Sequence, residues 1–286
     1  MRWDDGQIKV HAIETGRVAV HERQRRGSGP GPLRLLNTLL DRRWTDRLPI
    51  YFWLIEHPEG LIVVDTGETA RVAEPGYFPR WHPYFRFGVR EWVEENEEAG
   101  PALRRLGFDP ADVRWVVMTH LHTDHAGGLG NFPDREILVS RVELENASGA
   151  LGRLRGFLPH RWPGWFQPRQ IDFPSRPFGP FPQSLGLTEA GDVHLVSTPG
   201  HTLGHQSVVV EEDDGVLFLA GDTSYTEELM LRGAVDGVSP DASAAALTLG
   251  RIQELASQRP TVYLPTHDPA SGERLAARRP AVARDS

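Results

Sequence analysis

Four separate apolar runs of this chain each end in a histidine or an aspartate, and this pattern limits the folds that the chain can adopt. The runs are VVMTH, LVSTPGH, VLFLAGD and VYLPTH, and they end at His120, His201, Asp222 and His267. Short apolar runs bounded by Gly, Pro or polar residues predict buried strands. Because ligand sites of α/β sheets gather at the carboxyl ends of strands, we expect these four side chains to meet at one edge.

The stretch THLHTDHAGG, residues 119–128, places three histidines and one aspartate within six positions. His120 and His122 are two positions apart on an extended exit from a strand, so both side chains point to the same side of the backbone. Asp124 and His125 are adjacent and diverge where the chain turns. One pair can therefore serve one metal ion and the other pair a second ion nearby, whereas the alternative interpretation is a polar loop.

The composition narrows the chemistry of such a site. The sequence contains no cysteine, which excludes a thiolate metal site, a disulfide framework and a cysteine nucleophile. A formal net charge of −8 disfavours long polyanions, so we expect no nucleic acid partner. The N-terminal MRWDDGQIKV lacks the apolar core of a secretory signal, and no apolar stretch is long enough to span a bilayer. We therefore expect a cytoplasmic protein that does not enter a membrane.

The length and the absence of a convincing linker predict a single domain over residues 1–286, with loop insertions rich in aromatic residues and proline. Residues 22–32 are rich in Arg, Gly and Pro and predict a loop or arm. Residues 144–182 are dense in proline and aromatic side chains, which predicts an irregular, lid-like insertion. Aromatic-rich loops are also typical of subunit interfaces, and we expect a homodimer.

The motifs HLHTDH, TPGHTLGH, AGDTSY and PTHD resemble those of the metallo-β-lactamase-fold hydrolases. The resemblance extends from VDTG, which begins at Val64, to His267, and it implies an α/β fold of the αββα sandwich type. It also implies that His120, His122 and His201 hold one divalent metal ion. The remaining ligands would hold a second ion, with the last of them bridging both ions: Asp124, His125, His267 and Asp222. Zinc is the expected metal, and iron, manganese and cobalt accept the same ligand types.

Two further residues extend the resemblance. Asp65, at the end of VDTG, resembles the buried aspartate with which this family orients a ligand histidine, and carboxylates commonly do this at metal sites. The alternative for Asp65 is a cap at the end of a strand. Tyr225, three residues after Asp222, resembles a tyrosine that hydrogen-bonds the substrate carbonyl in the quorum-quenching N-acyl homoserine lactonases. The alternative for Tyr225 is a buried tyrosine that packs near the site.

The function expected from this resemblance is a dinuclear metal-dependent lactone hydrolase that opens the ring of N-acyl homoserine lactones. Asp124 would protonate the leaving alcohol, and Tyr225 would steady the carbonyl oxygen. The aromatic segments Tyr77–Phe87 and Phe157–Phe181 would hold the acyl chain. A phosphotriester or aryl ester hydrolase that uses the same metals is the alternative enzyme. A metal-dependent binding module without turnover is the alternative from another class.

Overall fold

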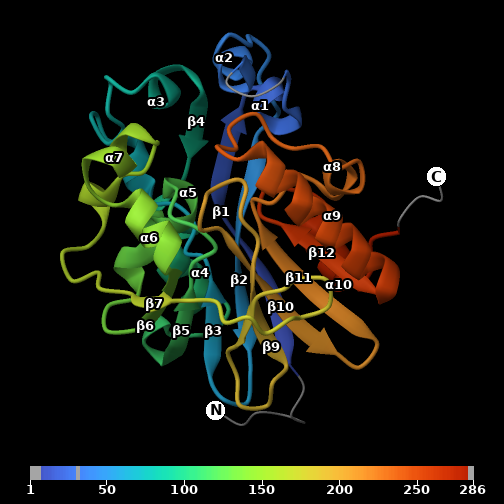
Figure 1. The fold of residues 1–286 in the computed structure, drawn as a ribbon. Helices are drawn as coiled ribbons and strands as arrows, with labels where there is room; N and C mark the ends of the chain where they lie inside the picture. Colours follow the sequence, from blue (N-terminus) through green and yellow to red (C-terminus); the bar gives the residue numbers. More distant parts are fainter. Residues whose placement is uncertain (1–7, 30–32, 283–286) are drawn as a thin grey trace.

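Two β-sheets pack face to face between layers of helices in the computed structural model, which describes residues 8–29 and 33–282 (Figure 1). The larger sheet has the strand order β4-β1-β2-β3-β5-β6-β7, and the smaller sheet has the order β12-β11-β10-β9-β8. This is the αββα sandwich that the resemblance to the metallo-β-lactamase-fold hydrolases implies, and the expected fold is confirmed. The strands of the larger sheet are β1 (Lys9–Val20), β2 (Leu48–Glu56), β3 (Leu61–Val64), β4 (Val89–Trp92), β5 (Val113–Val117), β6 (Glu136–Ser140) and β7 (Arg169–Ile171). Those of the smaller sheet are β8 (Ser184–Gly186), β9 (Val193–Ser197), β10 (Gln206–Glu212), β11 (Gly215–Gly221) and β12 (Thr261–Pro265).

Helices cover the outer faces of both sheets. α4 packs on the larger sheet and α9 on the smaller one, and α1, α2 and α3 lie together at one end of the sandwich (Figure 1). The α-helices are α1 (Glu22–Arg26), α2 (Leu33–Leu39), α3 (Pro83–Phe87), α4 (Ala99–Arg105), α5 (Thr123–Ala126), α6 (Arg141–Ala147), α7 (Gly149–Leu154), α8 (Glu227–Leu231), α9 (Ala242–Gln258) and α10 (Ser271–Ala276). Short 3-10 helices are η1 (Ala70–Ala73), η2 (Glu95–Glu97), η3 (Pro110–Asp112), η4 (Gly127–Asn131) and η5 (Pro159–Arg161). Among the described residues, no helix combines the length and the hydropathy needed to cross a membrane.

Successive side chains of β2 point into two different apolar clusters, which explains why the sequence of this strand is continuously apolar. Trp53 belongs to the apolar cluster between the sheets, together with Leu195 of β9. Its neighbour Phe52 belongs to the cluster on the opposite face, together with Leu103 of α4. Successive side chains of a strand point to opposite faces, so a strand that is covered on both faces needs apolar residues at every position.

Strand direction brings the predicted ligands to a common edge. β3 and β5 are parallel neighbours, so Asp65 and His120, which follow them, leave the larger sheet at the same edge. β9 and β11 both run antiparallel to β10, and β12 runs parallel to β11. The carboxyl ends of these three strands therefore share one edge of the smaller sheet. They lead to His201, Asp222 and His267.

Two segments are more regular than their composition predicts. Residues 22–26 form the helix α1 instead of a loop, whereas residues 30–32 of the predicted arm lie outside the described residues. Within residues 144–182, α6 ends, α7 follows, and β7 joins the edge of the larger sheet. The prolines of this segment begin at Pro159, after both helices, so they interrupt neither helix. The single domain, the lid and the homodimer stay predictions.

Candidate metal centre

The structure brings together all seven of the side chains that the sequence predicts as metal ligands. Three overlapping groups each offer ligand atoms that lie within 4.8 Å of one another. Among the described residues, these are the only groups of this kind. The groups are His120 with His122 and His201, His120 with His125 and Asp222, and Asp124 with His125 and His267.

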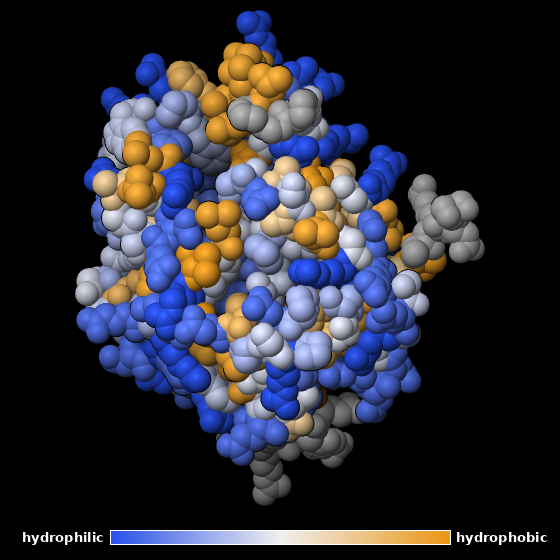
Figure 2. Space-filling view, in the orientation of Figure 1, coloured by the Kyte–Doolittle hydropathy of each residue, from blue (hydrophilic) through white to orange (hydrophobic). Residues whose placement is uncertain are grey.

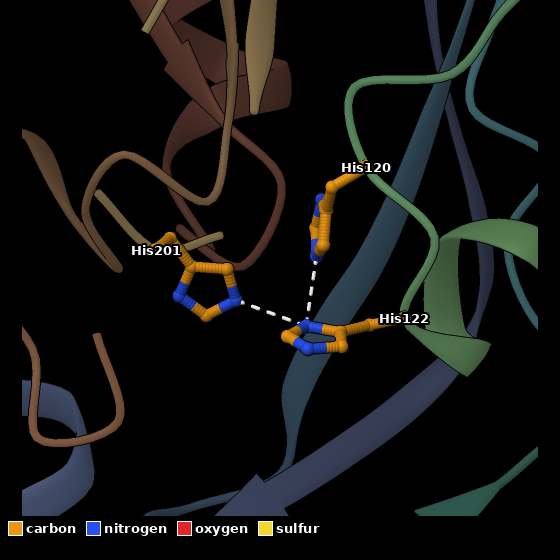
Figure 3. Close-up of side chains that lie close together, drawn as sticks. All are labelled: His120, His122 and His201. Atoms are coloured by element: carbon orange, nitrogen blue, oxygen red, sulfur yellow. Dashed lines mark hydrogen bonds between the residues drawn. The ribbon is translucent and has the colours of Figure 1, made fainter. Parts of the chain in front are cut away.

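The three histidines of the first group point their ring nitrogens at one another (Figure 3). His122 Nδ1 lies 3.0 Å from His120 Nε2 and 3.1 Å from His201 Nε2. Burial, reinforced by the neighbouring imidazoles, lowers the pKa of His120 well below its ordinary range. Burial and the proximity of His201 lower the pKa of His122 to about 3. His120 and His122 are therefore neutral at physiological pH, which is the form of imidazole that binds a metal.

Asp222 joins the histidines that come from the two sheets. Its Oδ1 lies 3.3 Å from His125 Nε2, and its Oδ2 lies 3.4 Å from His267 Nε2 and 3.5 Å from His201 Nε2. Asp124 Oδ2 approaches His267 Nε2 to 3.3 Å. The carboxylate of Asp222 therefore contacts members of both predicted metal sites, which is the position required of a bridging ligand.

Carboxylates hold protons on the histidines around Asp222. Burial opposes a charge on His267, but Asp222 and Asp124 together raise its pKa to about 10. Burial likewise opposes a charge on His125, and Asp222, Asp65 and Asp124 raise its pKa well above the ordinary value. Despite its burial, Asp124 has a pKa lowered to about 2 by His125 and His267. A metal ion that binds here must therefore displace protons from these histidines.

Two buried ligand atoms that complete no hydrogen bond within the described part of the chain indicate that the donor set fits a divalent cation. His125 Nε2 and Asp222 Oδ1 are buried and complete no hydrogen bond of acceptable geometry among the described residues. A buried polar atom without a partner costs about 1–3 kcal/mol. A divalent cation would accept a lone pair from each of these atoms, and imidazole with carboxylate is a common ligand set for zinc.

Asp65 fixes the orientation of His125. Its Oδ2 lies 2.8 Å from His125 Nδ1, so His125 directs Nε2 toward Asp222. The same carboxylate accepts hydrogen bonds from Thr119 N at 2.7 Å and from Thr119 Oγ1 at 2.8 Å. Asp65 adopts a φ of 60°, a conformation that aspartate tolerates better than most residues. It therefore acts both on the histidine and as a cap of the strand end.

Two buried carboxylates near the cluster carry no recognisable signal in the sequence. Asp236 Oδ2 lies 3.1 Å from His201 Nδ1, and burial notwithstanding, His201 lowers the pKa of Asp236. Glu143 accepts hydrogen bonds from Leu121 N at 3.0 Å and from Thr202 Oγ1 at 2.6 Å. Glu143 therefore ties the loop around His120 to the loop around His201. Only the general expectation of a carboxylate behind a ligand histidine points to such residues.

A cavity of about 750 Å³ opens onto the cluster. Tyr225 lines it, and the ring of Tyr225 stacks on that of His267 with centroids 5.5 Å apart. Five of the seven predicted ligands also line the cavity: His122, Asp124, His201, Asp222 and His267. The cavity therefore offers a ligand access to the cluster and to the tyrosine together.

The apolar wall of the cavity differs from the predicted one. Of the Phe, Tyr and Trp rings in residues 77–87 only Tyr84 and Phe85 line it, and of those in 157–181 only Phe157 does. Phe181 instead packs in the core beneath α9, where its side chain is fully buried. The leucines of α2 were not predicted from the sequence as part of this wall. Leu35 lines the cavity, and α2 forms part of an exposed apolar patch at the top of the molecule (Figure 2).

A second pair of carboxyl groups lies beside Asp124. Glu68 is fully buried, and it accepts hydrogen bonds from Thr69 N at 2.8 Å and from the Tyr77 hydroxyl at 3.2 Å. Burial raises the pKa of Glu68 to about 7, and the charge of Asp124 adds to the effect. Burial and the neighbouring Glu68 raise the pKa of Glu91 well above its ordinary value. The pair therefore holds at least one proton in the neutral protein.

We predict that Glu68→Gln stabilises the metal-free protein in a pH-dependent way. An unfolded glutamate loses its proton near 4.5 and the folded Glu68 near 7, so the wild type loses stability as pH rises through that interval. The variant should be more stable by roughly 3 kcal/mol at pH 8, and its advantage should vanish toward pH 4.5. Chemical denaturation across this pH range measures the difference, with the exposed Glu95→Gln as control. A difference that does not change with pH would contradict the prediction.

We also predict that Asp236→Asn weakens metal binding without unfolding the protein. Asparagine keeps the shape of the side chain but removes the charge behind His201, which should lower zinc affinity about tenfold. The matched control is Asp192→Asn, because Asp192 lies 3.0 Å from His57 and does not line the cavity. Competition with a coloured chelator measures both affinities. Equal losses in the two variants would sink the assigned role of Asp236.

The comparisons with known proteins agree with this geometry. The profile of the Metallo-beta-lactamase superfamily matches residues 45–267. A relative named N-acyl homoserine lactonase, from a Bacillus species, is 31% identical over 224 residues, which cover 77% of this chain and 82% of the relative.

Two solved structures share the fold. An N-acyl homoserine lactone hydrolase with the product N-hexanoyl-L-homoserine bound at its catalytic metal centre has a TM-score of 0.72 and 23% identity, covering 93% of this chain and 95% of that one. AidC, described as a dizinc quorum-quenching lactonase, has a TM-score of 0.62 and 17% identity, covering 93% of this chain and 90% of its own. The strand order, the ligand cluster at the strand ends and the superfamily match lead to one conclusion: this chain belongs to the metallo-beta-lactamase superfamily.

Proposed function

We propose that this protein is a dinuclear metal-dependent hydrolase that opens the lactone ring of N-acyl homoserine lactones. The observation that carries the proposal is the position of Tyr225, whose ring stacks on His267 at the wall of the cavity that reaches the ligand cluster. A phenol hydroxyl at this place can bind the carbonyl oxygen of an ester whose carbonyl carbon lies over the cluster. The activity named for the Bacillus relative supports the same substrate class.

The ligand cluster divides naturally between two ions. His120, His122 and His201 would hold one divalent ion. Two such ions, zinc or alternatively iron, manganese or cobalt, would lower the pKa of a water molecule and polarise the ester carbonyl. Asp124, His125 and His267 would hold the other ion, and Asp222 would be a ligand of both ions.

Tyr225 acts as a hydrogen-bond donor throughout the reaction. Burial raises the pKa of its hydroxyl well above the ordinary value, so the group stays protonated at any physiological pH. The carbonyl oxygen gains negative charge as the tetrahedral centre forms. A donor that is already held in place strengthens its hydrogen bond as that charge develops, which stabilises the transition state more than the ground state.

Asp124 moves the proton that ring opening requires. In the metal-free protein, His125 and His267 lower its pKa to about 2 despite its burial, and divalent ions would supply the positive charge in their place, so it is an acceptor at neutral pH. It takes a proton from the attacking water molecule as the new C–O bond forms. It returns that proton to the ring oxygen as the ring C–O bond breaks, and the product is the ring-opened N-acyl homoserine.

Mass spectrometry of N-octanoyl homoserine lactone after incubation with zinc-loaded protein tests the function. A product heavier by one water, with its acyl chain retained, is expected from the wild type and from neither the metal-free protein nor Asp222→Ala. Recovery of intact lactone from fully metallated protein would overturn the proposal. Hydrolysis of an aryl phosphotriester in that same sample would favour the alternative enzyme.

We predict that Tyr225→Phe lowers kcat/KM for this lactone while zinc content stays at the wild-type level. Loss of one hydrogen bond to a developing oxyanion, worth about 1.5–3 kcal/mol, should reduce kcat/KM roughly tenfold to a hundredfold. The control is Tyr51→Phe, since Tyr51 does not line the cavity. Steady-state kinetics and metal analysis of the same samples measure both quantities. Unchanged kinetics in Tyr225→Phe would remove the tyrosine from the mechanism.

A further inference from the structure

Two tyrosine hydroxyls at the cavity wall share one side-chain amide. Gln24 Nε2 donates to the Tyr225 hydroxyl at 2.8 Å and to the Tyr84 hydroxyl at 3.0 Å. The three residues come from distant parts of the chain, since Gln24 lies in α1, Tyr84 in α3 and Tyr225 after β11. All three line the cavity that contains the ligand cluster. The proposed reaction uses only one of the two hydroxyls.

The arrangement leaves both hydroxyl hydrogens available to a ligand. A glutamine amide nitrogen carries two hydrogens, so it can satisfy one lone pair on each hydroxyl oxygen. Among the described residues, neither hydroxyl forms a further hydrogen bond. Burial raises the pKa of Tyr84 above its ordinary value, so this hydroxyl also stays protonated. The cavity wall therefore presents two adjacent O–H donors.

Gln24 is held firmly enough to position both hydroxyls. Its side chain is buried, and only 1% of the residue is exposed. Its backbone oxygen accepts a hydrogen bond from Gly237 N at 2.6 Å, which ties α1 to the loop that carries Asp236. A Cβ at position 237 would lie 2.9 Å from Gln24 Cα, so glycine permits this close approach. Gln24 is accordingly a positioning residue.

Two neighbouring donors match two neighbouring acceptors in the proposed substrate. An N-acyl homoserine lactone has a ring carbonyl and an amide carbonyl, joined through a single carbon and a single nitrogen. We propose that Tyr84 donates a hydrogen bond to the amide carbonyl oxygen while Tyr225 donates to the ring carbonyl, so that Tyr84 selects lactones bearing an N-acyl amino group. This inference rests on the proposed lactonase function and adds to it a determinant of substrate class.

The alternative role for Tyr84 is purely structural. In that case its hydroxyl would brace α1 through Gln24, and its removal would affect every substrate alike. If Tyr84 instead donates a hydrogen bond to the amide carbonyl, removal of its hydroxyl weakens only substrates that contain the amide. A substrate without the amide never forms this hydrogen bond and therefore loses nothing. The ratio of kcat/KM for two lactones therefore separates the two roles.

The experiment compares N-octanoyl homoserine lactone with γ-dodecalactone, an alkyl lactone without an amide. Zinc-loaded wild type, Tyr84→Phe and the control Tyr51→Phe are assayed on both lactones. We define the ratio as kcat/KM for N-octanoyl homoserine lactone divided by kcat/KM for γ-dodecalactone. We expect Tyr84→Phe to lower this ratio roughly tenfold, mainly by raising KM for N-octanoyl homoserine lactone. Tyr51→Phe should leave the ratio at the wild-type value, since Tyr51 lies outside the cavity wall.

Each result decides the inference. A wild type that opens both lactones, with an unchanged ratio in Tyr84→Phe, overturns the role of Tyr84 and leaves the proposed function intact. A wild type that opens neither lactone with its metals bound removes the proposed function and this inference with it.

If Tyr84→Phe does not fold, Gln24→Met serves instead. That variant should lower kcat/KM on both lactones through Tyr225 and lower the ratio as well, and an unchanged ratio overturns the inference.

Discussion

The compensation of buried charge between the two sheets is the constraint on which the site depends. An apolar interface holds the sheets together but has no direction, because burial of apolar surface does not depend on orientation. The contacts of Asp222 with His125 and of Asp124 with His267 cross from one sheet to the other. An uncompensated charge at such depth costs several kcal/mol, so these contacts penalise any shift of one sheet against the other. The ligand cluster therefore stabilises the relative position of the two sheets, and the two sheets in turn position the cluster.

The site is made of a floor and a wall that come from different kinds of element. Its floor follows the ends of β5, β9, β11 and β12, where neighbouring strands fix each side chain. Its wall comes from short helices and loops at one end of the molecule, among them α1, α2 and α3. The backbone of a short helix is held by contacts such as the hydrogen bond from Gly237 N to Gln24 O, not by the helix itself. Under the proposed function, reactivity would therefore belong to the floor and substrate choice to the wall.

The sequence predicts the floor well and the wall poorly, for physical reasons. His120 and Asp222 each follow an apolar run, and strand direction carries that local signal into space. Asp236 and Gln24 have partners more than thirty positions away, and no periodicity marks such contacts. α1 has the sequence ERQRR, whose polar pattern alone does not distinguish a helix from a loop. Apolar character likewise could not tell that Phe157 lines the cavity while Phe181 lies in the core.

Protons and metal ions are alternative counter-charges for the same carboxylates. In the metal-free protein, His125 and His267 hold protons because Asp124 and Asp222 surround them, whereas His120 and His122 are already neutral. Divalent ions would replace those protons and engage the lone pairs of His125 Nε2 and Asp222 Oδ1, which face each other at 3.3 Å without a hydrogen bond of acceptable geometry. Either form balances the buried charge, while the strand ends place the ligands. Preorganised ligands in turn reduce the conformational entropy that metal binding would otherwise cost.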